Sequence, residues 1–136
     1  MLATPTPDAA EARANATFDA MLWALSRPGL PRQLRQTGEA AVIAALVDRE
    51  CRVYAGDPLL IPVVAQSGAQ LVELPQADHV FFGKLIDLDL FRQLRCGSDL
   101  YPDEGATVIL HVTFGTGPEV RLSGPGIDGV VDVRIG

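Results

Sequence analysis

The sequence predicts a single domain over residues 1–136 of the α/β class, or of the related α+β class, with helices flanking a mixed β-sheet in three layers. Three observations support this prediction. Helical periodicity opens the chain, helical and strand-like runs alternate through its middle, and strand-like runs close it. At 136 residues the chain can bury a core without disulfides, because a domain of this size buries roughly two-thirds of its unfolded surface.

The first helix is expected to begin at Thr6-Pro7-Asp8, a helix-start signal, and to end at Pro28-Gly29. Residues 1–16 are accordingly expected to be partly a flexible arm and partly the start of this helix. One face of this helix carries an apolar stripe, which is expected to pack on a core. Trp23 lies off this stripe, at the edge of the core or facing a partner. The stripe consists of Phe18, Met21, Leu22 and Leu25.

A second helix is expected within residues 37–50, with Thr37 as a possible N-cap. Residues 51–58 then read as a short strand closed by a Gly-Asp-Pro turn. Residues 59–68 favour a short helix, although Pro62 fits only its first turn or a break. The inward face of the second helix is expected to carry Val42, Ala45 and Leu46.

Two short strands are expected within residues 70–74 and 78–82. A helix of about two turns follows within residues 87–97, with Gly97 as its stop. Residues 105–114 give the strongest strand signal, and their unbroken apolar run predicts burial on both faces of the sheet.

The stretch LSGPGIDG places Gly124, Gly126 and Gly129 on the spacing of a dinucleotide-binding loop. Such a loop must open a helix whose N-terminus faces the phosphate, whereas a β-branched run follows here. Pro125 also removes a backbone donor that a phosphate would need. The stretch is therefore expected to be a turn between two strands, with no bound dinucleotide.

The composition bears on partners and location. Apolar residues make up 48% of the chain, which is high for a small domain and suggests a surface covered by a partner. The net charge of −6 and the scattered arginines argue against nucleic acid as a ligand. The chain has neither a secretory leader pattern nor a long apolar run, so we expect no membrane association and a cytoplasmic protein.

No catalytic, cofactor-binding or metal-binding residue is predicted from these residues alone. Cys51, Cys96, His79 and His111 are not at metal-ligand spacing, and both thiols are expected to be buried and free. His111 is expected to donate to a backbone carbonyl, and Asp78 and His79 to form a surface pair. None of the serines lies in a nucleophile elbow; they are Ser26, Ser67, Ser98 and Ser123.

Four motifs together resemble one family, the H subunit of the bacterial carbon–phosphorus lyase system. FDAMLWALSRPG is similar to the end of the family's first helix, and ALVDRE with ADHVFF gives a weaker match. Two further motifs are a Gly-x-x-x-x-Pro-x-x-Gly-Ala-Thr stretch and a Leu-x-Gly-Pro-Gly-Ile turn. Their matching positions are Gly97, Pro102, Gly105, Ala106 and Thr107 for the first, and Leu122, Gly124, Pro125, Gly126 and Ile127 for the second.

The resemblance implies a fold like a reduced large domain of the pyridoxal phosphate-dependent transferases, without their active site. It also implies that this chain lacks the family's C-terminal segment. A Schiff-base enzyme needs a lysine in a pocket, and the single lysine, Lys84, is expected to be solvated at a strand exit. No cofactor is therefore expected.

The resemblance further implies a homodimer that joins the sister subunits G, I and J in a core complex. That complex transfers a phosphonate to the ribose C1 of ATP with release of adenine. We expect this chain to be a structural and assembly subunit without a complete active site. The alternative is a standalone enzyme or ligand-binding domain with a pocket near His111, Asp103 and Glu104.

Overall fold

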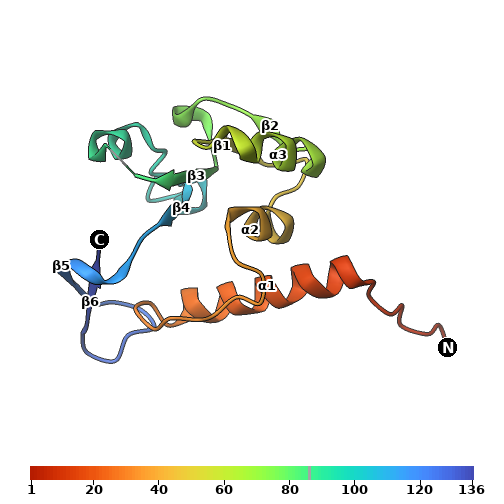
Figure 1. The fold of residues 1–136 in the computed structure, drawn as a ribbon, viewed down its shortest axis with the longest axis horizontal. Helices are drawn as coiled ribbons and strands as arrows, with labels where there is room; N and C mark the ends of the chain where they lie inside the picture. Colours follow the sequence, from red (N-terminus) through yellow and green to blue (C-terminus); the bar gives the residue numbers. More distant parts are fainter. Residues whose placement is uncertain (86) are drawn as a thin grey trace. The chain divides into compact units, whose positions relative to one another are not determined.

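A computed structural model describes residues 1–85 and 87–136 of the protein. The chain divides into two compact units, each of which is described by itself (Figure 1). The terminal unit comprises residues 1–45 and 113–136, and the central unit comprises residues 46–112. The predicted combination of a β-sheet with flanking helices is confirmed, while the single domain over residues 1–136 stays a prediction.

The central unit is built on a four-stranded sheet, with the strand order β2-β1-β3-β4. All neighbouring strands in this sheet run parallel, and α3 (Ile61–Ser67) connects β1 to β2. The prediction of one mixed sheet is therefore corrected: the parallel strands form one sheet, and the last two strands of the chain form another. The four parallel strands are β1 (Arg52–Ala55), β2 (Gln70–Leu71), β3 (His79–Lys84) and β4 (Thr107–His111).

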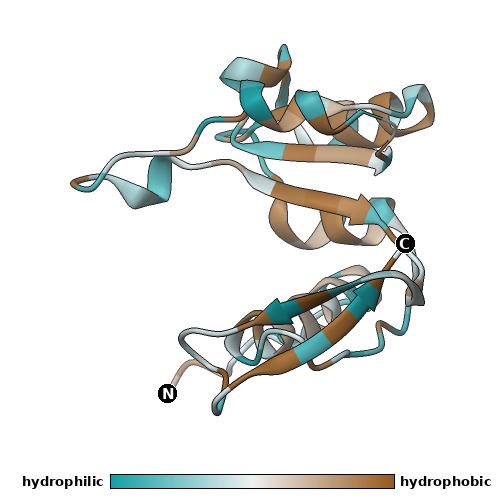
Figure 2. Cartoon of the chain, turned by 90° about the vertical axis from the view of Figure 1, so that its left-hand side faces the viewer, coloured by the Kyte–Doolittle hydropathy of each residue, from teal (hydrophilic) through white to brown (hydrophobic). Residues whose placement is uncertain are grey.

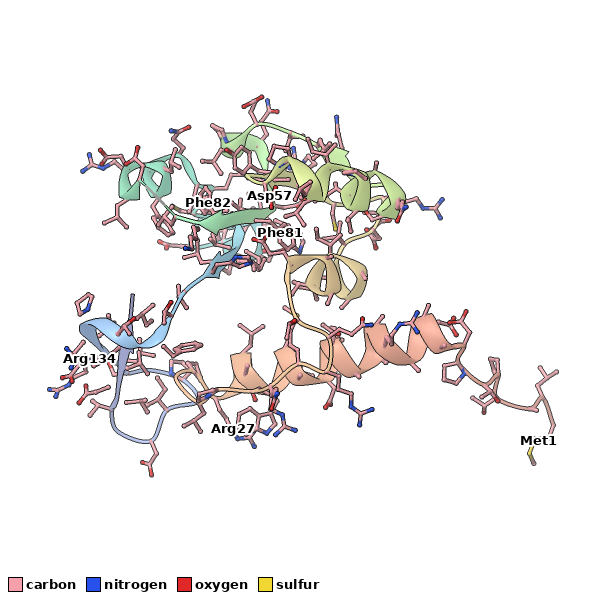
Figure 3. All side chains as sticks on the ribbon, viewed as in Figure 1. Met1, Arg27, Asp57, Phe81, Phe82 and Arg134 are labelled. Carbon is pink, nitrogen blue, oxygen red and sulfur yellow. The ribbon has the colours of Figure 1, made fainter. Side chains whose placement is uncertain are left out.

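The core of the central unit is organised around β3, one of the two inner strands. Its residues Val80 and Phe81 are fully buried, which is typical of an inner strand of a parallel sheet. Figure 3 shows Phe81 and Phe82 on this strand. The ring of Phe82 packs edge-on against Tyr54 and Phe91, with centroid distances of 5.9 and 5.8 Å. These aromatic contacts join β3 to β1 and to the segment that follows β3.

The strand expected to be buried on both faces, β4, is only half-buried along its middle and exposed at both ends. The reason is its position, because β4 is the last strand at one edge of the sheet. The expected helix in 87–97 is also corrected, since it is a 3₁₀ helix over Leu88–Gln93. Gly97 lies beyond its end, although this glycine does have a positive φ of 71°.

Short 3₁₀ turns complete the central unit. They cover Pro58–Leu60, Leu74–Gln76 and Pro102–Glu104. Each begins with or contains a proline near its start, where the missing N–H costs no helical hydrogen bond.

The terminal unit begins with α1 (Ala9–Ser26), whose predicted start is confirmed. The side chain of Asp8 accepts a hydrogen bond from the Glu11 N–H at 2.8 Å, and the Glu11 side chain accepts one from the Asp8 N–H at 2.8 Å. This reciprocal pair is a capping box, which satisfies two backbone donors at the helix start.

The second helix, α2 (Glu39–Leu46), is shorter than the predicted 37–50, and its last residue falls in the central unit. Asp48 explains the early end. Its side chain accepts the Glu50 N–H at 2.9 Å and its carbonyl accepts the Cys51 N–H at 3.1 Å, so this segment turns rather than continuing the helix. The buried residues of α2 include Val42 as expected, and also Ile43 and Glu39.

The last two strands, β5 (Phe114–Leu122) and β6 (Val131–Ile135), form an antiparallel hairpin. Figure 2 shows hydrophobic and hydrophilic residues alternating along these strands, and in β6 half-buried residues alternate with exposed ones. The turn predicted for Gly124–Gly129 is confirmed, because a loop without a helix joins the two strands.

None of the helices within residues 1–85 and 87–136 is both long and apolar enough to cross a membrane.

Candidate functional site

Two of the sequence motifs meet in the terminal unit, where the end of α1 contacts the hairpin turn. Gly29 has a φ of 88°, and a Cβ built there would lie 2.8 Å from Val131 Cγ1 and 3.3 Å from Leu122 Cδ1. Gly126 has a φ of 84°, and its Cβ would collide with the carbonyl oxygen of Ser26. Both motifs therefore need glycine for two reasons, a left-handed backbone and a close approach of two chain segments. We call this contact the motif junction.

An apolar groove of about 330 Å³ lies beside the motif junction. It is formed between the end of α1 with its following loop and the two strands of the hairpin. Its apolar lining includes Ala24, Leu30, Phe114, Leu122, Val133 and Ile135. One charged residue, Arg32, also borders it.

The apolar stripe of α1 is largely exposed, which corrects the expectation that it packs on a core. Phe18 is 48% exposed, Leu22 55% and Leu25 73%. The buried residues of this helix are instead Thr17 and Ala20, which are small enough to lie close to the rest of the unit. An exposed apolar row on a helix is typical of a surface that binds a partner.

The hairpin of the same unit also carries exposed apolar residues. Phe114 is 65% exposed at the start of β5, and Val130 is 55% exposed before β6. We define the apolar surface of the terminal unit as Phe18, Leu22, Leu25, Leu30, Phe114, Val120 and Val130.

Trp23, which lies off this stripe as predicted, is half-buried beneath two arginines. The guanidinium carbons of Arg27 and Arg32 lie 4.9 and 4.7 Å from its ring centroid. These cation–π contacts cover the indole and connect the end of α1 to the loop after it.

Lys84 is the exposed last residue of β3, as expected for a lysine at a strand exit. In the sheet register it lies opposite His111 of β4. A lysine that forms a Schiff base is enclosed in a pocket, whereas the Lys84 side chain is exposed.

The alternative pocket near His111, Asp103 and Glu104 does not match the structure. Asp103 and Glu104 lie in an exposed 3₁₀ turn that precedes β4, whereas His111 ends that strand. A five-residue strand separates the two positions by about 16 Å of extended chain. These three side chains therefore do not converge on one site.

The candidate serine nucleophiles make local backbone contacts. Ser26 Oγ donates to the Trp23 carbonyl at 2.8 Å, and Ser98 Oγ accepts the Tyr101 N–H at 3.0 Å. Such contacts are typical of hydroxyls at helix ends and turns. They give these two serines a structural role.

The expectation of two buried thiols is wrong. Both cysteines are free, but Cys96 is exposed and Cys51 is half-buried. Partial burial, together with the negative charges of Asp48 and Asp78, raises the pKa of the Cys51 thiol. The difference arises because both cysteines lie at the borders of short elements rather than inside a strand.

Cys51 lies beside two further polar residues that sequence spacing did not connect. Its sulfur, a carboxylate oxygen of Asp78 and a ring nitrogen of His79 all lie within 4.8 Å of one another. The predicted Asp78–His79 pair is present, with 2.7 Å between Asp78 Oδ1 and His79 Nδ1, and both side chains are half-buried. A signal in the sequence could have located this group. Cys51 directly precedes β1, and Asp78 directly precedes β3, the parallel strand beside it, which begins at His79.

Comparison with known proteins agrees with the motifs. The family described as bacterial phosphonate metabolism protein (PhnH) matches residues 7–136. A protein of Stutzerimonas stutzeri named as a C-P lyase subunit protein, HtxG, is 32% identical over 125 residues. The match covers 85% of this chain and 60% of that relative, so the chain spans about three-fifths of the relative's length.

Proposed function

Because the chain belongs to the PhnH family of bacterial phosphonate metabolism proteins, we propose that it is a structural and assembly subunit of a carbon–phosphorus lyase core complex. In this proposal it supports the transfer of a phosphonate to the ribose C1 of ATP, with release of adenine, in the cytoplasm. Its partners are a second copy of the chain and the sister subunits G, I and J. The name of the Stutzerimonas relative, a C-P lyase subunit, supports this assignment.

The exposed stripe of α1 is the observation that carries the proposal. An isolated small domain gains free energy by turning apolar side chains inward, at about 25 cal/mol for each Å² of apolar surface removed from water. Here Phe18, Leu22 and Leu25 remain exposed on one helix. A partner that covers them recovers this free energy, and a subunit of a stable complex has such a partner.

The chemistry in this proposal belongs to other subunits. Lys84 is exposed, and the residues of the alternative pocket lie at opposite ends of β4. We therefore assign no catalytic residue to this chain for the phosphonate reaction.

The fold is part of the same proposal. We infer that the protein has a reduced form of the large domain of pyridoxal phosphate-dependent transferases. The parallel sheet of the central unit, with α3 crossing between β1 and β2, supports this inference. It agrees with the βαβ construction that such domains share.

Co-purification with the sister subunits tests the assembly role. Co-expressed with subunits G, I and J, the tagged chain is expected to recover all three in a stable complex. Replacing Leu22 and Leu25 together by Glu should lower that recovery about tenfold or more, because it puts charges into an apolar contact. The matched control is Leu59→Glu, at a residue 80% exposed in the central unit, which should leave recovery unchanged.

Circular dichroism would confirm that both variants fold. Full recovery by the folded double variant would count against α1 as the binding surface. Failure of the unaltered chain to recover any sister subunit, or turnover of a phosphonate by the isolated chain, would contradict the assembly role itself.

A further inference from the structure

A cluster in the central unit carries an inference that is independent of the assembly role. We propose that Cys51, Asp78 and His79 form a binding site for one Zn²⁺ ion. The three side chains supply a sulfur, an oxygen and a nitrogen, which are the donor atoms that zinc takes in proteins.

The distances bring these donors close to the arrangement that a metal needs. All three donor atoms lie within 4.8 Å of one another. Around a tetrahedral zinc ion, with bonds of about 2.0–2.3 Å, neighbouring donors are roughly 3.3–3.8 Å apart. Side-chain movements of about 1 Å would bring the donor atoms from within 4.8 Å of one another to the separations around a zinc ion. Such movements need no change in the backbone of the sheet.

The backbone holds the three residues together at the N-terminal ends of the neighbouring strands β1 and β3. Both oxygens of Asp78 accept the Arg52 N–H, at 3.0 Å each, and the Asp78 N–H donates to the Arg52 carbonyl at 2.9 Å. Arg52 directly follows Cys51, so these bonds hold the backbone at Cys51 close to Asp78. Asp78 Oδ1 also lies 2.7 Å from His79 Nδ1, so the carboxylate and the ring are already neighbours. A bound ion would take the place of this direct contact, with the two donors moving slightly apart.

The surrounding charge favours a cation. Asp48 Oδ1 lies 3.5 Å from the Cys51 sulfur, so two carboxylates flank the thiol. A divalent cation offsets their mutual repulsion and stabilises the thiolate. With three protein ligands, the fourth position of a zinc ion stays open to water or to a further ligand.

A cysteine–histidine–aspartate relay is the competing interpretation of the same residues. In such a relay the imidazole stands between the nucleophile and the carboxylate, and keeps them apart. Here the sulfur and the Asp78 oxygen are themselves neighbours, within 4.8 Å. A triangular arrangement of this kind fits a shared ion better than a linear relay.

Metal binding by the full chain tests the site. The chain should be purified without a polyhistidine tag, reduced, and dialysed against ZnCl₂, and we expect one Zn²⁺ per chain. Replacing zinc by Co²⁺ should give a thiolate-to-cobalt charge-transfer band. Cys51→Ser should abolish this band and weaken Zn²⁺ binding at least about tenfold, and His79→Gln and Asp78→Asn should each weaken binding about 10- to 100-fold.

Cys96→Ser is the matched control, because Cys96 is the other free thiol and is exposed. It should keep both the charge-transfer band and the affinity of the unaltered chain. The proposal is overturned if the unaltered chain gives no charge-transfer band, a result that does not depend on how any variant folds. Equal Zn²⁺ affinity in folded Cys51→Ser, or loss of the band in folded Cys96→Ser, would also overturn it.

Discussion

Gly126 and Gly129 lie in the same turn between β5 and β6 and have similar backbones, with φ values of 84° and 73°. Their surroundings differ. A Cβ at Gly126 would collide with the Ser26 carbonyl oxygen and lie 3.0 Å from Pro28 Cδ, whereas one at Gly129 would meet nothing within 4 Å. The first glycine is thus required by close packing as well as by its backbone, and the second by its backbone alone.

This difference predicts unequal effects of alanine at the two positions. Gly129→Ala should lower the free energy of unfolding by about 1 kcal/mol, the cost of a left-handed alanine. Gly126→Ala adds a backbone collision and should cost about 2–4 kcal/mol. Urea unfolding followed by circular dichroism measures both. Equal losses for the two variants would show that the motif junction is not tightly packed.

The second prediction at the residue scale concerns Lys84, which is exposed at the end of β3. Lys84→Ala should leave recovery of the sister subunits nearly unchanged, because removing a solvated ammonium group breaks no buried contact. Pyridoxal phosphate mixed with the unaltered chain should give no saturable visible absorbance band. A saturable band that disappears in Lys84→Ala would show a Schiff base between the cofactor and Lys84, and would contradict a purely structural role for the chain.

At the scale of elements, the sequence predicted best where local signals determine the structure. The start of α1 was predicted correctly because the local residues Asp8 and Glu11 cap the helix. The hairpin of β5 and β6 was predicted correctly because β-branched runs flank a stretch of turn residues. The prediction that β4 is buried on both faces was wrong. Its unbroken apolar run is typical of an inner strand, but β4 lies at an edge of the sheet and is only half-buried along its middle. Which strand lies outermost is decided by tertiary pairing, which local patterns do not contain.

The hairpin carries an ion pair whose pH dependence can be predicted. Arg121 Nε donates to Asp132 Oδ1 at 2.8 Å and Arg121 Nη2 donates to Asp132 Oδ2 at 3.2 Å, between facing residues of β5 and β6. The hydrogen bonds from Arg121 lower the pKa of the Asp132 carboxyl. Because the pKa in the folded hairpin is depressed, the pair stabilises the hairpin above the ordinary aspartate pKa, and this stabilisation is lost as the pH falls through the depressed value.

Carboxyl titration of Asp132 by NMR measures this effect. We expect a pKa below the ordinary aspartate value in the unaltered chain, and a rise toward that value in Arg121→Gln. High salt should shrink the difference, since both side chains are partly exposed. An unchanged pKa in Arg121→Gln would show that the pair does not persist in solution.

At the scale of the whole molecule, the sequence indicated that the apolar excess marks a partner surface but not where that surface lies. The spacing of Phe18, Leu22 and Leu25 is the same for a helix that packs on its own core and for one that packs on another chain. In the structure all three side chains are exposed, as the proposed contact with a partner requires. The Cys51, Asp78 and His79 cluster was missed for a related reason, because residues 27 positions apart meet through the pairing of β1 with β3.

The same apolar surface leads to the last prediction, that the chain forms a homodimer. A two-stranded sheet is marginally stable alone, and β5 is exposed along nearly all of its length, with Phe114 65% exposed. Burying roughly 800 Å² on each copy would give a stable dimer. Because each copy carries a net charge of −6, the two copies repel, and added salt should strengthen association by screening that repulsion.

Light scattering at micromolar concentration should therefore report the mass of two chains, with the dimer fraction rising as salt is added. Phe114→Glu should shift the protein toward the monomer, because it places a further negative charge on the apolar surface of the terminal unit. Leu100→Glu is the matched control, at a residue 84% exposed in the central unit, and should leave the mass unchanged. A monomer at every salt concentration, or equal dissociation by both variants, would contradict a dimer formed through this surface.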